Sequence, residues 1–214
     1  MRKRFDVQLN ELHRLMTQMG EMLDEALTMM VEALVKRDVV LAKKVIVNDI
    51  TVDEMEKEIE QLCMRLLMQQ QPVAGDLRII SSALKIVTDM ERIGDHAADI
   101  SDNITYMYKD DYTPHIGDIV KMAEKAGQMV KDSVRAFVQK DMELAQKVLA
   151  KDDEIDALFL KVKLDLIKKL REDASMSELS MDLMMNAKYL ERIGDHAENI
   201  AEWVVFAITG DRVV

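Results

Sequence analysis

The amino-acid sequence predicts an all-α protein made of two tandem, pseudo-symmetric three-helix bundles, with six long antiparallel helices in all. Three observations support this fold class. The 214 residues include only 7 Gly and 2 Pro, and 49% are hydrophobic, a composition typical of long helices. Apolar residues recur at steps of three and four along most of the chain, as they do on one face of a helix. A seven-residue motif also occurs twice, which indicates an internal repeat.

Short polar or proline-containing breaks separate the six predicted helices. The first apolar stripe runs from Leu9 to Leu34. Breaks suited to a cap or a turn follow at Lys36-Arg37-Asp38, Gln71-Pro72, Thr113-Pro114, Gln139-Lys140-Asp141 and Ser175 to Ser177. Helices are therefore expected at residues 4–36, 38–70, 74–109, 114–139, 141–171 and 176–208.

Two halves of the chain resemble each other. The motif Glu-Arg-Ile-Gly-Asp-His-Ala stands at residues 91–97 and again, identical at every position, at 191–197. Upstream, the segment DVVLAKKV at 38–45 resembles DMELAQKV at 141–148. Pro114 lies between the halves and follows a polar stretch. We therefore expect one three-helix repeat at residues 1–112 and a second at 113–214, each with short turns between antiparallel neighbours.

Composition limits the partners and the compartment. A formal net charge of −11 and a pI near 4.9 repel the phosphate backbone, so nucleic acid is not expected as a partner. Cations, or proteins with basic surfaces, fit better. Cys63 is the single cysteine, which excludes an intramolecular disulfide and indicates a reducing compartment. No apolar run reaches the roughly 18 to 20 residues of a membrane helix, so the chain is expected to be cytoplasmic.

Acidic side chains form two rows in each half. Glu91, Asp95 and Asp99 recur every four residues and so lie along one helix face, and the second motif repeats the row with an amide at its third position. The preceding helix of each half supplies a further row. Facing carboxylate rows predict a metal site, and their oxygen atoms suit Mg²⁺, Ca²⁺, Mn²⁺ and iron. The candidate metal ligands are Asp49, Asp53, Glu91, Asp95, Asp99, Asp152, Asp156, Glu191 and Asp195, and Glu56 ends the row that Asp49 and Asp53 begin.

Other interpretations of these residues stay open. The acids could simply solubilise a helical adaptor, or a carboxylate-bridged cluster could serve a metalloenzyme. No Glu-x-x-His pair of the di-iron type occurs in the chain, which argues against that enzyme class. His96 and His196 are interpreted as structural residues or, alternatively, as ligands that would favour iron or zinc. Gly94 and Gly194 lie in helix interiors, where glycine indicates tight helix packing or a close approach to the backbone.

The duplicated motif, set in two three-helix halves of this length, resembles the PhoU family of phosphate-specific transport accessory proteins over essentially the whole chain. The resemblance implies two three-helix bundles, a homodimer, and metal held on the acidic faces, iron or zinc foremost, with manganese and magnesium as alternatives and multinuclear clusters in some members. It also implies a non-enzymatic negative regulator. Its partners would be the phosphate ABC transporter with its ATPase and a phosphate-sensing histidine kinase, so that the membrane is approached only through partners.

The second half departs from the first at positions that matter for the predicted site. We therefore expect its site to bind metal more weakly or with other ligands. The replacements are Asn199 for Asp99, Tyr189 for Asp89 and Phe159 for Glu56.

Overall fold

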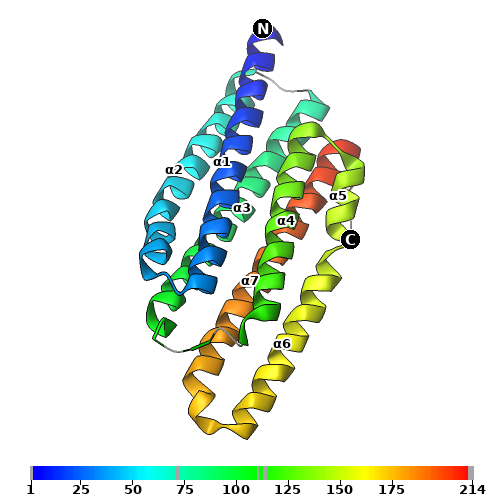
Figure 1. Cartoon of the computed structure of the whole chain (residues 1–214). Coiled ribbons are helices and arrows are strands. Elements are labelled where there is room, and N and C mark those ends of the chain that lie inside the picture. The colour runs from blue at the N-terminus through cyan, green and yellow to red at the C-terminus, as the bar shows by residue number, and fades with distance from the viewer. Residues whose placement is uncertain (1, 71–72, 110, 113–114, 212–214) are drawn as a thin grey trace.

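The computed structural model describes residues 2–70, 73–109, 111–112 and 115–211, and these residues are helical almost throughout, with no strand among them. The predicted all-α class is confirmed (Figure 1). The elements in chain order are α1 (Arg2–Lys36), α2 (Val39–Gln70), α3 (Ala74–Met107), α4 (Gly117–Gln139), α5 (Met142–Leu149), α6 (Asp152–Glu172), the 3-10 helix η2 (Ala174–Met176) and α7 (Ser177–Thr209).

The prediction of one continuous helix at 141–171 is wrong, because a turn at Ala150 and Lys151 divides it into α5 and α6. The Lys151 N–H bonds the Val148 carbonyl three residues back, which tightens the chain and ends α5. Three acids then occupy the first turn of α6, namely Asp152, Asp153 and Glu154. Negative charge is favoured at a helix N-terminus, so this sequence starts a new helix. The other five helices agree with the prediction to within a few residues.

The same turn joins the first two helices of each repeat. Arg37 and Lys140 both adopt a left-handed conformation with φ of 55°, which ends α1 and α4. The next residue in each case is an aspartate that caps the following helix: the Asp38 carboxylate accepts from the Leu41 N–H at 3.0 Å, and Asp141 accepts from Leu144 at 3.0 Å. Both predicted caps are confirmed. The predicted breaks at Gln71-Pro72 and Thr113-Pro114 lie outside the described residues, so the boundary between 112 and 113 stays a prediction.

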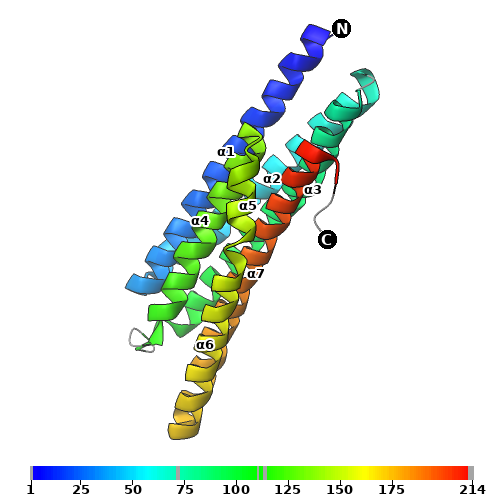
Figure 2. The ribbon, with the colours of Figure 1, turned by 90° about the vertical axis from the view of Figure 1, so that its right-hand side faces the viewer.

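Each repeat packs as three antiparallel rods. Helices α1, α2 and α3 form one set, and α4, α7 and the end-to-end pair α5 and α6 form the other (Figures 1 and 2). The two sets meet along α3 and α7, with α1 packed on α4. Buried apolar side chains from both sets form one continuous core. The duplicated motif lies on α3 and α7, the two helices through which the repeats contact each other. None of the helices in the described parts of the chain is long and apolar enough to cross a membrane.

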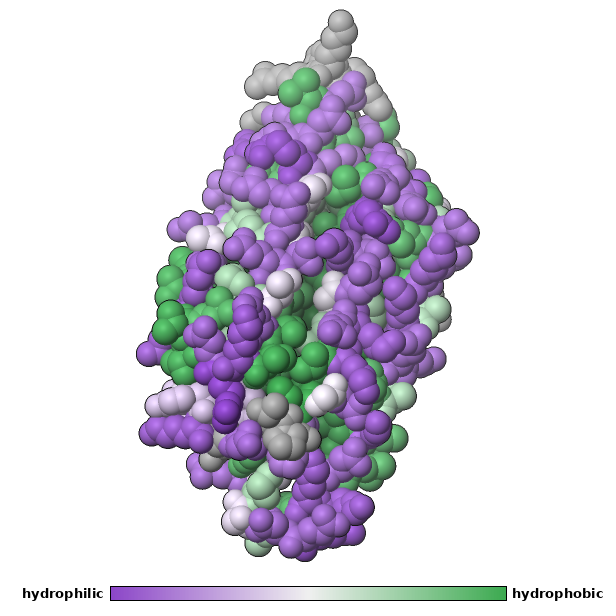
Figure 3. Space-filling model, in the orientation of Figure 1, coloured by the Kyte–Doolittle hydropathy of each residue, from purple (hydrophilic) through white to green (hydrophobic). Residues whose placement is uncertain are grey.

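The surface is largely hydrophilic, as the composition predicts. Figure 3 shows one face, on which apolar patches interrupt the polar surface, including one over α2. Two valines and an isoleucine of α2 are exposed, among them Val40 at 80% and Ile50 at 60%. Scattered exposed apolar residues are normal for a folded protein.

Candidate metal centres

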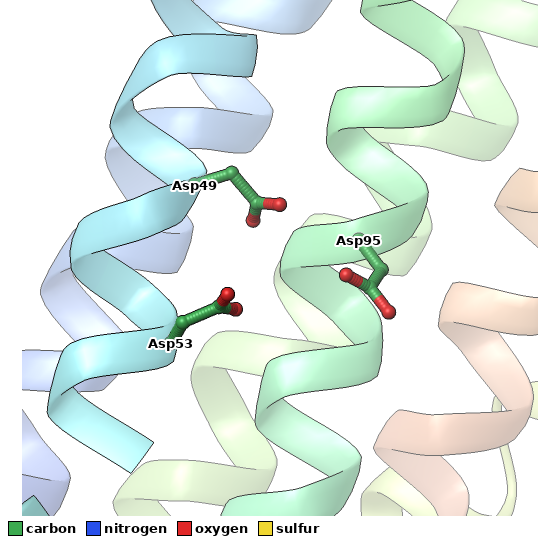
Figure 4. A group of neighbouring side chains, drawn as sticks. All are labelled: Asp49, Asp53 and Asp95. Carbon is green, nitrogen blue, oxygen red and sulfur yellow. The ribbon is translucent and has the colours of Figure 1, made fainter. Parts of the chain in front are cut away.

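The first repeat brings together three of the predicted ligands. Asp49 and Asp53 stand one turn apart on α2, and Asp95 faces them from α3. One carboxylate oxygen of each lies within 4.8 Å of the others, and the three side chains point toward a common gap between the helices (Figure 4). All three residues are partly buried. We call this group the first triad.

The second repeat forms an equivalent group, the second triad. Asp152 and Asp156 come from α6 and Asp195 from α7, again with one oxygen of each within 4.8 Å of the others. Asp156 is exposed here, whereas Asp152 and Asp195 are partly buried. Because Asp152 is the first residue of α6, the turn that divides the predicted helix lies directly beside this triad.

Carboxylates crowded in this way resist ionisation. Burial, and then the neighbouring charges of Asp95 and Asp53, raise the pKa of Asp49 to about 6. Burial, followed by Asp195 and Asp156, raises the pKa of Asp152 to the same value. Both shifts show that the folded chain holds these negative charges at a cost. A bound cation would remove that cost.

Little in the protein itself neutralises the triads. Among the described residues, no hydrogen bond or ion pair reaches Asp49 or Asp53, whereas Asp95 accepts from Arg92 at 3.0 Å. Asp152 and Asp156 of the second triad likewise form no ion pair with a basic side chain among the residues that the structure describes. Such all-oxygen donor sets suit hard cations, which prefer carboxylates. The residues present therefore fit a metal ion.

The glycine of the motif explains how α2 approaches α3. A Cβ atom at Gly94 would lie 2.8 Å from Asp49 Oδ1 and 3.1 Å from Val52 Cγ1. Both interpretations of this glycine therefore hold, because the helices pack tightly at the same point where the Asp49 carboxylate approaches the backbone. Gly194 plays a similar part, with Ile155 Cδ1 at 2.9 Å and Asp152 Oδ1 at 3.3 Å from the equivalent point. Only a residue without a side chain leaves room for the aspartate.

Gly94→Ala should therefore weaken metal binding at the first triad by about tenfold, because the new methyl group displaces the Asp49 carboxylate. The accompanying loss of stability should be about 1 kcal/mol, at the low end for overpacking, since a flexible side chain can move aside. Titration calorimetry with Mn²⁺ measures the affinity. Gly75→Ala is the matched control, because nothing lies within 4 Å of a Cβ there. Equal affinities in the two variants would show that the glycine does not position the ligand.

The other predicted acids lie beside the triads. Burial and the charge of Asp95 raise the pKa of Glu91, which also lies 3.4 Å from Arg92. Glu191 pairs with Lys188 at 2.6 Å. Asp99 Oδ2 lies 3.6 Å from His96 Nδ1, one turn away on the same helix, and the Asp99 charge also contributes to the raised pKa of Asp49. Asp99, Glu91 and Glu191 lie outside the triads, and their part in metal binding stays a prediction.

Glu198 is an acid that the sequence analysis missed. Burial, and then Asp152 and Glu202, raise its pKa to about 7, so Glu198 adds a further carboxylate beside the second triad. The first repeat has Ala98 at the matching position. A comparison restricted to matched acids cannot find such a residue, although its spacing of three from Asp195 puts both on one helix face.

The two histidines of the motif face each other between the repeats. Their rings lie 5.6 Å apart, and the Tyr189 ring stacks on His96 at 5.4 Å. His196 Nδ1 lies 2.8 Å from Asp89 Oδ1. Asp89 and Tyr189 occupy equivalent positions in the two repeats. Each contacts the histidine of the other repeat, Asp89 through a hydrogen bond to His196 and Tyr189 by stacking on His96. Neither histidine belongs to a triad.

The other departures between the repeats have local explanations. Asn199 donates to Asp89 at 3.5 Å, so the amide serves the contact between repeats and not the second triad. Phe159, which replaces Glu56, lies under the Lys188 ammonium at 5.4 Å. The same ammonium pairs with Glu191. The second site is therefore built with a lysine and an aromatic ring where the first has an acid.

Comparison with known proteins agrees with an arrangement of two helical repeats. The family model described as PhoU domain matches residues 16–104 and again 119–204. A protein from Clostridium acetobutylicum named phosphate-specific transport system accessory protein PhoU homolog is 38% identical over 99% of this chain and 97% of its own length. A homologue of the same name from Aquifex aeolicus is 38% identical over 86% of this chain and 84% of its own.

Solved structures show the same fold. The crystal structure of PhoU from Pseudomonas aeruginosa superposes with a TM-score of 0.93 at 31% identity, covering 97% of this chain and all of that one. The phosphate transport system regulatory protein PhoU from Streptococcus pneumoniae gives 0.91 at 26% identity, covering 98% and 99%. The repeat, the paired helix geometry and the full-length relatives agree, and the chain belongs to the PhoU family.

Proposed function

We propose that this chain is a metal-binding regulator of phosphate homeostasis that restrains a phosphate-specific ABC transporter and the phosphate-starvation response. The observation that carries the proposal is a pair of equivalent carboxylate triads in a chain whose full-length relatives are named as accessory proteins of phosphate-specific transport. The proposed role is regulatory and not enzymatic.

The chemistry of the donor set bears on which metal is bound. Each triad offers carboxylate oxygens alone, and His96 and His196 lie between the repeats instead. Carboxylate-only sites favour iron, manganese or magnesium over zinc. Of the two metals put first by the family resemblance, iron thus fits these residues better. The metal would act as a structural or sensing element by joining α2 to α3 and α6 to α7.

The proposed partners follow from the family. We propose that the chain works in the cytoplasm as a homodimer, on the ATPase of the transporter and on a phosphate-sensing histidine kinase. Names such as accessory protein and regulatory protein, given to the relatives, support association with a transport system. A net charge of −11 suits contact with basic protein surfaces.

A strain lacking the chain tests the proposed role. In phosphate-rich medium, the deletion should raise expression of a phosphate-starvation reporter by about tenfold, and the wild-type gene should restore repression. A variant with all six triad aspartates changed to asparagine should restore it poorly, since the metal would no longer join the helices. A variant with only the first triad changed has its matched control in Glu54→Gln, Glu58→Gln and Asp102→Asn, which alter three exposed acids of the same two helices.

Two outcomes would oppose the proposal. An unchanged reporter in the deletion strain would remove the regulatory role. Full repression by the sixfold variant, at wild-type protein levels on an immunoblot, would separate regulation from the triads. Loss of repression in the control variant as well would trace the defect to general charge removal and so contradict a specific role of the metal.

A further inference from the structure

A pocket of about 340 Å³ lies far from both triads, where the start of α3, the end of α4 and the end of α7 meet. In Figure 2 the last turns of α7 run beside the first turns of α3. At 1.5 Å of rise per residue, the lining residue Ile79 stands about 24 Å along α3 from Asp95, and Ala207 about 18 Å along α7 from Asp195. Ligand binding here would therefore not involve the triads.

Two cationic side chains line this pocket, Arg78 from α3 and Lys140 from the end of α4. Neither forms an ion pair with a residue that the structure describes, and the Arg78 Nε atom is buried without a hydrogen-bond partner. A buried donor without a partner is costly. Unpaired cations are also unexpected in a chain with 40 acids and 29 basic residues. Their meeting in one pocket points to an anion.

The backbone fixes the point from which the Lys140 side chain leaves α4, and it leaves room for the Arg78 guanidinium. Lys140 has a left-handed φ of 55° and its N–H bonds the Phe137 carbonyl at 3.3 Å. Arg78 lies against Gly210, whose φ is 88°. A Cβ atom at Gly210 would stand 3.3 Å from an Arg78 terminal nitrogen, so any side chain there would crowd the guanidinium. A group fixed in advance loses less entropy when it binds a ligand.

The rest of the lining is mainly apolar and comes from three helices: Ile79, Phe137, Val204, Ala207 and Ile208. Gly75 and Asp76 complete it. Asp76 is largely buried and has an interaction of its own, and it gives the pocket one carboxylate against two cations. A pocket with an apolar wall and a few charged groups is typical of a small-molecule site. Its volume exceeds what a single tetrahedral oxyanion fills.

We propose that this pocket binds a small phosphate-bearing molecule, with the phosphate between Arg78 and Lys140 and any organic part against the apolar wall. A phosphate dianion matches two cations, and guanidinium and ammonium groups are its usual protein ligands. The proposal goes beyond the proposed function, because it gives the protein an effector site that is separate from the metal centres. Free phosphate and a phosphate monoester share this chemistry.

Titration calorimetry on metal-free protein tests the proposal, since phosphate would also coordinate bound metal. The probes are inorganic phosphate and AMP at constant ionic strength, with sulfate as the comparison ion. We expect saturable binding of at least one phosphate probe with a Kd below about 1 mM, a value usual for metabolite sites. The variant Arg78→Gln with Lys140→Gln should bind at least about tenfold more weakly.

A matched control is Lys147→Gln with Arg171→Gln, which removes the same charge from exposed positions outside the pocket. Its affinity should stay within about twofold of wild type. Lys140→Gln alone serves if the double variant fails to fold, and should weaken binding at least threefold. AMP bound more tightly than phosphate would identify a monoester site, and the reverse order a site for the free ion.

Two results would overturn the proposal. One is the lack of saturable binding of either probe up to about 10 mM. The other is equal affinity of the pocket variant, the control variant and the wild type, which would place any binding elsewhere. Because the protein is metal-free throughout, neither result bears on the triads. The experiment therefore distinguishes a wrong proposal for the pocket from a wrong proposal for the metal centres.

Discussion

Asp49→Asn should stabilise the metal-free protein at pH 8 and at the same time lower metal affinity at the first triad by about 100-fold, as expected when a metal ligand is lost. These opposite effects distinguish a binding site from a structural ion cluster. The carboxylate sits against Gly94, faces Asp53 and Asp95, and has no basic partner among the described residues. Removing its charge thus relieves repulsion in the empty site and deletes a ligand from the occupied one.

The pKa of Asp49 fixes the pH range of the stabilisation. Burial and the adjacent carboxylates raise this pKa from 3.8 to about 6, so between these values the folded state binds more protons than the unfolded chain. The contribution of Asp49 to the stability of the wild type therefore falls as pH rises from about 4 to about 6 and is constant above. Asparagine avoids this loss. Its benefit should be absent at pH 4 and reach about 1 kcal/mol above pH 6, after allowance for solvent screening.

Urea unfolding of metal-free protein at pH 4 and pH 8 measures this difference, and Mn²⁺ titration at pH 8 measures the affinity. Glu54→Gln on the same helix is the control and should change neither by much. A variant that is destabilised at pH 8 would show that Asp49 is held by favourable contacts. Unchanged Mn²⁺ affinity at the first triad would remove it from the ligand set.

Metal affinity should fall with acidity earlier, and more steeply, at the second triad than at the first. Protons compete with metal for carboxylates once the pH drops below their pKa. At the first triad the relevant value is about 6, for Asp49. At the second, Asp152 has the same value and the neighbouring Glu198 has about 7. Between pH 7 and pH 5 we expect a loss of about tenfold at the first triad and of about 500-fold at the second, since each group costs about one decade for every pH unit below its pKa.

Each triad can be measured alone when the other is removed by three Asp→Asn changes. Mn²⁺ titrations at pH 7, 6 and 5 then give the two profiles. Glu198→Gln should make the second profile resemble the first, because it removes the group that titrates near pH 7. Parallel profiles in the two single-site proteins, unchanged by Glu198→Gln, would show that this glutamate does not influence binding.

Much of the fold could be predicted from the sequence because its signals are local. Apolar steps of three and four define the helices, and Asp38 and Asp141 cap α2 and α5 as predicted. The duplicated motif locates the paired helices α3 and α7 at the contact between repeats. The turn at Lys151 was not predicted, because it interrupts an apolar pattern that continues across it. Its cause is the acidic first turn of α6 beside the second triad.

All six triad aspartates are among the ligands that the sequence predicts, but the sequence does not separate them from Glu91, Asp99 and Glu191, which lie outside the triads. Spacing along one helix gives the direction of a side chain only to within part of a turn, so it does not show that Asp99 also contacts His96. The pairing of His196 with Asp89 depends on contacts between segments 107 residues apart. Glu198 lies outside the repeat pattern altogether. Such features follow from packing between helices, which a single sequence does not encode locally.

Elemental analysis of protein purified without an affinity tag or chelator tests the metal centres most directly. The wild type should carry stoichiometric iron, zinc, manganese or magnesium. A variant with Asn at all six triad positions (Asp49, Asp53, Asp95, Asp152, Asp156 and Asp195) should carry none, and each three-residue variant about half. Equal metal content in the wild type and the sixfold variant would contradict the account. So would a wild type that stays metal-free after incubation with excess Fe²⁺, Mn²⁺, Zn²⁺ and Mg²⁺.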